Sequence, residues 1–219
     1  SAKNNLYKKS KATVDYYVDT NKPYTLDSVL TNIESKVLDS IYKNSEQESF
    51  LKTGNQFKFS YFLDEQNRLT HLFRNSGIYR FTKNAINFEA DSTNAEYKSD
   101  VTIIINDSIG GVPFKIQKIK EVNIYTDYSY NSKDDPIKDS LIYNGYNFKA
   151  FKNLKYNPKL LLNSVFIEPN DLYNDENREL TRKHIRGLSN FRSVEINYTE
   201  LPDDNLVASI RLTPLKKYS

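Results

Sequence analysis

Apolar residues in the last third of the chain recur first at the helical period and then at every second position. A helix is expected over 175–189, where three residues spaced by four and three share one face: Thr181, Ile185 and Leu188. Alternation over 191–198 predicts a half-buried strand, and a second alternation over 206–213 predicts its partner. The Pro- and Asp-containing segment 201–205 supplies the turn between them.

Upstream of this helix, the same unit begins with a β-prone run and a second, shorter helix. The run covers 114–125, and Asn157-Pro158 opens a helix around 159–163. The order over 113–218 is therefore β–α–α–β–β. A polar, Tyr-rich stretch at 131–155 interrupts it as an insertion to which the pattern assigns no element.

The first half of the chain repeats this order of elements. The patterns favour a strand over 24–33, a short helix over 36–43 and a longer helix over 61–76. Two further strands are expected over 79–89 and 101–105. The repetition indicates two units of one architecture.

Two adjacent glycines, Gly110 and Gly111, separate the units. Residues 12–18 alternate as one more strand, which is either the last strand of a preceding domain or an extra strand of the first unit. The expected division is a tail, a first domain and a last domain, over 1–21, 22–109 and 112–219.

The core positions of both units follow a recognisable spacing. In the second unit they are Thr181, Ile185, Leu188, Phe191, Val194 and Ile196, followed by the run 206–218. In the first unit they lie within 63–81, where Gly77-Ile78-Tyr79 carries Ile in place of one usual aromatic. With these motifs the chain resembles the periplasmic POTRA domains of the BamA/TamA outer-membrane assembly family, most closely the Bacteroidota branch similar to TamL. The resemblance covers most of 24–218, apart from 131–155.

The resemblance implies an α+β fold of tandem POTRA-like β-α-α-β-β domains, each a small three-stranded mixed sheet with two helices on one face. It implies a periplasmic location, in a parent protein held in the bacterial outer membrane by a C-terminal barrel absent from this fragment. The implied partners are unfolded outer-membrane proteins, assembly accessory subunits or both, during insertion or translocation. Insertion of barrel proteins and export of surface lipoproteins both stay open, because each could use pairing of a client segment with a strand edge.

A small sheet with helices on one face leaves an edge strand whose N–H and C=O groups can pair with an extended client segment. By the family's arrangement this edge is the strand after the longer helix. The candidate pairing residues are Tyr79, Arg80, Phe81, Lys83, Arg192, Ser193, Val194, Glu195 and Ile196. The residues expected to form the motif core are Gly77, Thr181, Ile185, Leu188 and Phe191. The charged pairing candidates have a second interpretation, in which they only protect the edge from aggregation. These are Arg80, Lys83, Arg192 and Glu195.

Composition argues against several classes of function, namely nucleic-acid binding, thiol chemistry and metal binding. The net charge of +3 gives no basic footprint for nucleic acid, and the chain has no cysteine for thiol chemistry or zinc–cysteine sites. The two histidines, His71 and His184, fall on different expected helices, and His184 has basic neighbours that would repel a cation. We therefore expect that the chain is not an enzyme and that it has no metal site and no cofactor.

Two other functions remain open from the sequence. The chain could be a structural spacer that positions a barrel and captures nothing. It could instead bind glycans through the Tyr-rich stretch 125–146, provided that the rings lie exposed on one face.

Overall fold

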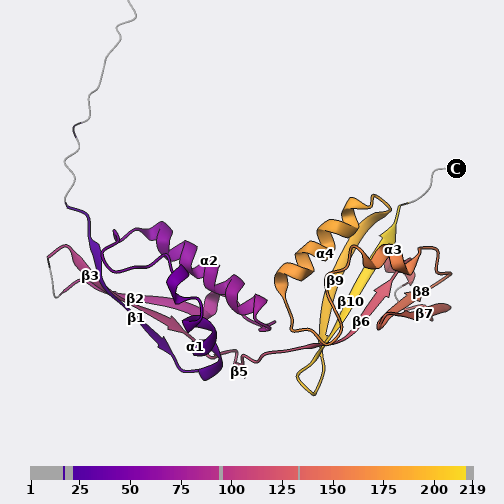
Figure 1. The fold of residues 1–219 in the computed structure, drawn as a ribbon, viewed down its shortest axis with the longest axis horizontal. Coiled ribbons are helices and arrows are strands. Elements are labelled where there is room, and N and C mark those ends of the chain that lie inside the picture. Colours follow the sequence, from indigo (N-terminus) through magenta and orange to yellow (C-terminus); the bar gives the residue numbers. More distant parts are fainter. Residues whose placement is uncertain (1–16, 18–21, 94–95, 133, 216–219) are drawn as a thin grey trace, which may run out of the picture.

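The computed structural model describes Tyr17 and residues 22–93, 96–132 and 134–215, which form two units joined by a narrow connection (Figure 1). The strand expected over 12–18 lies outside the described residues except for Tyr17, which belongs to no helix or strand. Within the described residues no helix is long and apolar enough to cross a membrane.

The first unit has the expected β-α-α-β-β order. Its elements are β1 (Thr25–Ile33), α1 (Lys36–Lys43), α2 (Phe59–Asn75), β2 (Ile86–Asp91) and β3 (Lys98–Ile105). The sheet order is β1-β3-β2, with β3 parallel to β1 and antiparallel to β2. This is the mixed three-stranded sheet that the resemblance implies.

The second unit keeps this order and adds a hairpin. Its elements are β6 (Ile119–Tyr125), β7 (Asp139–Tyr143), β8 (Tyr146–Ala150), α3 (Pro158–Leu162), α4 (Asp175–Gly187), β9 (Phe191–Glu200) and β10 (Leu206–Pro214). The sheet order is β7-β8-β6-β10-β9, and β6 runs parallel to both β8 and β10. The expected three-stranded sheet therefore has five strands, because the unassigned insertion supplies β7 and β8.

The turn between β7 and β8 is formed by Asn144 and Gly145, with φ angles of 49° and 80°. Two central residues with positive φ are typical of the tight hairpin turn whose twist matches that of the flanking strands. Tyr143 pairs with Tyr146 on either side of the turn. A local Asn-Gly signal thus closes the hairpin.

Side-chain caps start α1, α3 and α4, whereas α2 begins without one. Ser35 accepts a hydrogen bond from the N–H of Leu38, and Asn157 accepts one from Lys159. The buried face of α1 is formed by Leu38 and Tyr42, whereas Val37 faces outward.

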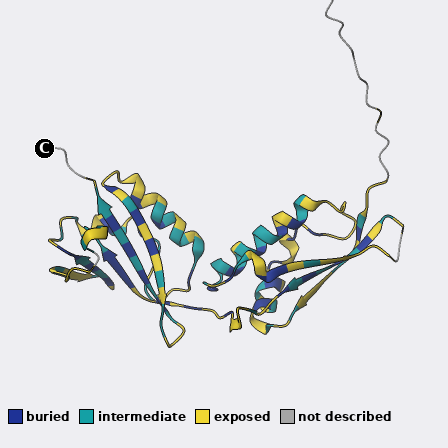
Figure 2. Cartoon of the chain, turned by 180° about the vertical axis from the view of Figure 1, so that it is seen from behind, coloured by how far each residue is buried: buried dark blue, intermediate teal, exposed yellow. Residues whose placement is uncertain are grey.

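Each unit has its own hydrophobic core, and Figure 2 shows the buried positions along the strands of both sheets. One cluster joins α2 to the inner face of the first sheet, for example through Leu69, Phe73 and Ile103. The other joins α4 to the second sheet, for example through Ile185 and Ile210. Folding of each half therefore rests on its own apolar contacts.

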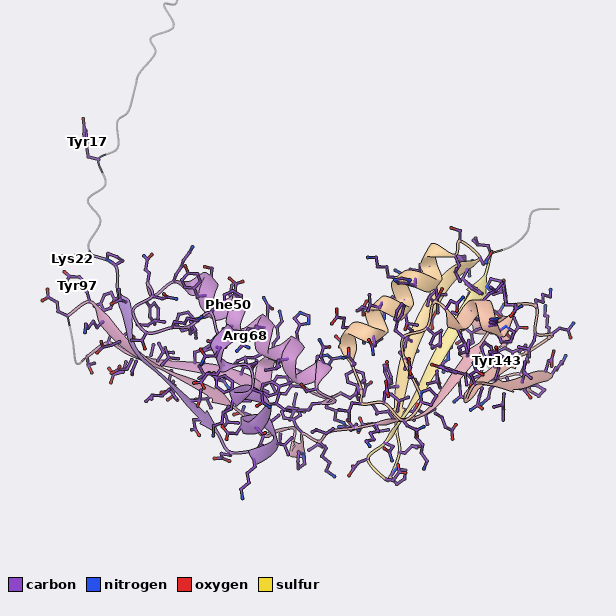
Figure 3. The ribbon with its side chains drawn as sticks, viewed as in Figure 1. Tyr17, Lys22, Phe50, Arg68, Tyr97 and Tyr143 are labelled. Carbon is purple, nitrogen blue, oxygen red and sulfur yellow. The ribbon has the colours of Figure 1, made fainter. Side chains whose placement is uncertain are left out.

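A buried ion pair lies at the centre of α2. The Glu65 carboxylate accepts hydrogen bonds from Arg68 at 2.6 and 3.0 Å and from the N–H of Phe50 at 2.9 Å. Arg68 also donates to the carbonyl and hydroxyl oxygens of Ser45. The pair thereby holds the segment between α1 and α2 against α2 (Arg68 and Phe50 are labelled in Figure 3).

The connection between the units is a small hairpin of β4 (Ser108–Ile109) and β5 (Val112–Pro113). Gly110 and Gly111 form its turn, both with positive φ. Beyond it, Phe114 packs on Phe81 in the first core, with ring centroids 5.0 Å apart. The connection is thus attached to the first unit before the chain enters β6.

Candidate sheet edge and the joint between the units

Strand β9 forms one edge of the five-stranded sheet. It pairs with β10 in antiparallel register over almost its whole length and, among the described residues, has no strand on its other side. Helix α4 packs against one face of β9. The backbone of β9 is therefore held in place while one side stays available for pairing.

The hairpin turn determines which backbone groups point away from β10. The N–H of Leu201 donates to Asn205 O at 2.8 Å, and Asp204 donates to Leu201 O at 3.1 Å with a φ of 60°. Because paired and unpaired positions alternate along an antiparallel ladder, this closure directs the odd-numbered residues of β9 from 193 to 199 towards β10. Between these positions, the groups left for a new strand are those of the even-numbered residues Val194, Ile196 and Tyr198.

The side chains of β9 divide in the same way. Phe191, Val194 and Ile196 are buried in the second core. Arg192 and Glu195 are exposed, and Ser193 donates a hydrogen bond to Glu195 at 3.3 Å. A strand paired to β9 would meet anchored backbone groups flanked by these polar side chains.

The other edges are shorter or partly covered. The start of β1 is paired with the segment around Gln56, and a register shift follows between Leu26 and Val29. The edge of β6 is occupied by β8 of the inserted hairpin. β2 and β7 have six and five residues, so β9 is the longest uncovered edge among the described strands.

The expected strand over 79–89 begins only at Ile86, so four candidate residues do not lie on an edge strand: Tyr79, Arg80, Phe81 and Lys83. Phe81 is buried in the first core, and Lys83 starts a 3₁₀ turn. Tyr79 and Arg80 face the second unit. Local alternation does not distinguish a strand from a loop whose alternate side chains enter two different environments.

Four of the five expected motif-core residues are buried, namely Gly77, Thr181, Ile185 and Phe191. The hydroxyl of Thr181 accepts a hydrogen bond from the N–H of Phe166 at 2.9 Å. Leu188 is the exception, because it lies at the C-cap of α4 and is 39% exposed. The helical stripe ends one turn earlier than its spacing suggests.

Three tyrosines from both units pack together at the joint. The rings of Tyr79, Tyr173 and Tyr198 have pairwise centroid distances of 5.1–5.4 Å. Edge-to-face pairs at this distance add to the free energy of burial. Tyr79 is thereby a contact residue between the units.

Arg74, in the last turn of α2, connects the two units through hydrogen bonds. It donates to the carbonyls of Tyr79 and Phe81 at 3.0 and 3.1 Å. Its other nitrogen donates to the Tyr173 hydroxyl at 2.6 Å and to Asp175 at 2.9 Å. The tyrosine hydroxyl in turn donates to Asp175 at 2.7 Å. The guanidinium therefore satisfies acceptors from both sides of the joint.

The ends of α2 and α4 also cap each other. The Asn174 side chain donates to the Asn75 carbonyl at 3.3 Å, and the Asn75 side chain accepts from the N–H of Glu176 at 3.1 Å. Figure 1 shows the end of α2 approaching the start of α4. Since the partial charges at these two ends are opposite, the arrangement is also electrostatically favourable.

Gly77 allows the chain to turn at the joint. Its φ is +99°, and a Cβ at this position would lie 2.9 Å from Ile116 Cγ2. Its carbonyl accepts a hydrogen bond from the N–H of Gln117 at 2.9 Å, and Gln117 O accepts one from Tyr173. Gly77, which follows the end of α2, thus permits close contact with the start of the second unit.

Arg80 forms the outer edge of the joint. It lies 2.6 Å from Glu200, and the two side chains are 43% and 30% exposed. Exposed ion pairs of this kind contribute little to stability, in contrast to the half-buried Arg74 network.

Acid is expected to weaken this joint. Burial alone would raise the pKa of Asp175, but hydrogen bonds from Arg74 and Tyr173 and the charges of Arg74 and Arg178 lower it below its ordinary value. A carboxylate whose pKa is lower in the folded state stabilises that state above its unfolded pKa, and this contribution is lost as the pH falls through the folded pKa. Coupling between the units should be constant near neutral pH and decline below about pH 4. The melting temperature measured against pH tests this, because the Asp175→Asn variant should lose less of it in acid than the native chain does. An equal loss in both proteins would show that Asp175 does not cause the weakening in acid.

Within the described residues no group of three or more His, Cys, Asp or Glu side chains is placed to hold a metal. His71 lies exposed on α2, and His184 lies exposed on α4 against Phe166. The joint residues Arg74, Tyr173, Asn174 and Asp175 were not singled out as site residues by the sequence, because nothing local distinguishes them from ordinary helix-end residues.

No protein-family model and no curated protein matches the chain. Among solved structures, BamA from Haemophilus ducreyi lacking POTRA domains 1–3 is similar, with a TM-score of 0.59 and 7% identity over 88% of this chain and 30% of that one. POTRA3–5 of Haemophilus influenzae BamA align with a TM-score of 0.49 and 13% identity over 87% of this chain and 61% of that one. The chain thus spans less than two thirds of either protein. The first likeness and the element order show the expected fold, a tandem of POTRA-like α+β domains.

Proposed function

We propose that the chain is a non-catalytic, polypeptide-binding region of an outer-membrane assembly protein of the BamA/Omp85 kind, working in the periplasm. The fold shared with the BamA structure supports this assignment. The Bacteroidota branch similar to TamL is the proposed relative, on the motifs of both units. Its partners would be unfolded outer-membrane proteins or assembly subunits, and it would assist their insertion or translocation.

The observation that carries the proposal is the free edge of β9. Ten residues of strand are fixed by β10 on one side and by α4 on one face, and their outer backbone groups remain available. Pairing along such an edge depends mainly on main-chain hydrogen bonds, so it suits a receptor for many different extended segments. Arg192 and Glu195 would bias the choice of client by charge.

A second candidate function, the rigid spacer, is favoured by the joint. Arg74, the tyrosine cluster and the reciprocal caps of α2 and α4 connect the units through several independent contacts. A spacer would use this rigidity to position neighbouring domains and would need no client at β9.

The glycan-binding alternative is less well supported by the packing of the Tyr-rich segment. Tyr146 is buried, Tyr125 stacks on Phe151, and Tyr128 lies beneath Arg211. Rings engaged with their own protein do not form the continuous exposed platform that this function needs.

A backbone NMR titration with unfolded β-signal peptides from outer-membrane barrels separates client pairing from the spacer. Client pairing predicts amide shifts concentrated on β9, strongest at Val194, Ile196 and Tyr198, because their N–H groups acquire acceptors. The spacer predicts no shifts at saturating peptide, and that outcome would reject client capture by this chain.

Two N-methylated peptides supply a matched control. Methyl groups on alternate residues remove the donors from one edge of the peptide, while methylation of the intervening residues spares that edge. One isomer should lose binding to β9 and the other should keep it. Equal behaviour of both isomers would indicate side-chain contact in place of strand pairing.

A further inference from the structure

The end of the second unit opposite the joint combines three segments. The last turn of α4 lies there with the start of β9, and Leu215 after β10 donates its N–H to Asn190 O at 3.0 Å. Figure 1 shows the C-terminal ends of α4 and β10 at this end, away from the first unit. Tyr156 packs on Phe191 with ring centroids 4.7 Å apart, so the loop after β8 joins the same end.

Positive side chains are concentrated at this end. Between Glu179 and Glu195 the sequence has four cationic residues, Arg182, Lys183, Arg186 and Arg192, and no acidic one. Lys183, Arg186 and Arg192 are exposed, and no ion pair links them to another described residue; Arg182 alone contacts Glu179, at 3.3 Å.

The loop after β8 adds two more exposed lysines, Lys152 and Lys155. The nearby carboxylate of Asp127 accepts hydrogen bonds from the N–H groups of Phe151 and Lys152 at 2.8 and 2.9 Å. This acid is therefore engaged with the backbone. Asp127 keeps its negative charge, and Asp139 accepts a hydrogen bond from the N–H of Leu154 at 2.9 Å, so two carboxylates offset these two lysines. The excess of positive charge at this end therefore comes from α4 and β9.

Cations in the last turn of α4 also favour the helix dipole. That effect accounts for Arg186, but it does not account for Arg192 on β9 or for the loop lysines. It also does not explain two leucines at the same end, Leu188 and Leu215, which are 39% and 49% exposed. The combination of long cationic side chains with exposed leucines is typical of surfaces that contact lipid headgroups.

We propose that this basic end (Lys152, Lys155, Arg182, Lys183, Arg186 and Arg192, with Leu188 and Leu215) rests on an anionic membrane surface. The cations come from a helix, a strand and a loop. Cations dispersed over three separate segments fit a field of mobile phosphate headgroups better than one folded acidic partner. This inference does not depend on client pairing at β9.

The test uses a fluorescent probe at the proposed contact. The full chain has no cysteine, so Leu188→Cys accepts a single environment-sensitive dye, and Leu63→Cys on α2 provides a second label position in the first unit. Phosphatidylglycerol vesicles should shift the dye at position 188 and leave the dye at 63 unchanged. Phosphatidylcholine vesicles should shift neither, and added salt should weaken the effect.

A charge-neutralised variant measures the contribution of the patch. Lys183→Gln, Arg186→Gln and Arg192→Gln together should weaken vesicle binding about 100-fold, at about fivefold per basic residue. The matched control removes three exposed lysines of the first unit, through Lys36→Gln, Lys52→Gln and Lys83→Gln. All variants keep the N-terminal lysines, so those residues do not explain a difference.

The outcomes separate the proposal from its rivals. Selective loss in the first variant, with an unchanged melting temperature, supports membrane contact at the basic end. Equal loss in both variants, binding without a shift at position 188, or absence of vesicle binding would each overturn it. Patch-dependent binding of polyglutamate without vesicle binding would assign the surface to an acidic protein and would also overturn it.

Discussion

Replacing Glu65 by alanine is expected to lower the free energy of unfolding of the first unit by about 3–5 kcal/mol. Glu65 is 0% exposed, and the Arg68 side chain that pairs with it is only 12% exposed. Without the carboxylate, the guanidinium stays buried without its counter-charge, and the N–H of Phe50 loses its acceptor. Urea unfolding followed by circular dichroism should show an earlier transition for the first unit and an unchanged one for the second.

The control for this prediction is Glu48→Ala, an exposed acid in the same segment, which should change stability by less than about 0.5 kcal/mol. Glu65→Gln should fall between the two variants, since an amide oxygen still accepts from Phe50 without balancing the charge. A Glu65→Ala variant as stable as the control would mean that the ion pair is not needed to hold the segment.

Arg74→Ala is expected to separate the motions of the two units. The variant loses two bonds to backbone carbonyls, one to Tyr173 and one to Asp175, and leaves Asp175 half-buried with fewer donors. The free energy that couples the units should fall by about 2–4 kcal/mol. ¹⁵N relaxation should show one common rotational correlation time in the native chain and two shorter, different times in the variant.

Arg80→Ala is the matched control, because Arg80 lies at the same joint in an exposed ion pair. Its effect on coupling should stay below about 1 kcal/mol, and the common correlation time should persist. Equal effects of the two arginine variants, or a common correlation time in Arg74→Ala, would show that the tyrosine cluster and the helix caps suffice for coupling.

Much of the fold follows from local pattern. The helix over 36–43, the alternation in β9 and β10, and the caps at Asn157 and Asn174 depend on residues close in sequence. The hairpin β7–β8 was also within reach, since Asn144-Gly145 is a strong turn signal. It was missed because its flanking strands are short, and β7 carries exposed Leu141 and Ile142 in place of a clear alternation.

The candidate site also combines features that local pattern predicts with features that depend on tertiary contacts. The β-α-α-β-β order of both units, most of their buried positions and the strand from Phe191 onward could be predicted from the sequence, because amphipathic periods and caps act over a few residues. Only the tertiary structure decided that Tyr79 and Arg80 form a joint, that Glu65 is buried with Arg68, and that an inserted hairpin covers the edge of β6. Each of these depends on groups brought together from segments far apart in sequence or on burial beneath them, and the local pattern carries no information about either.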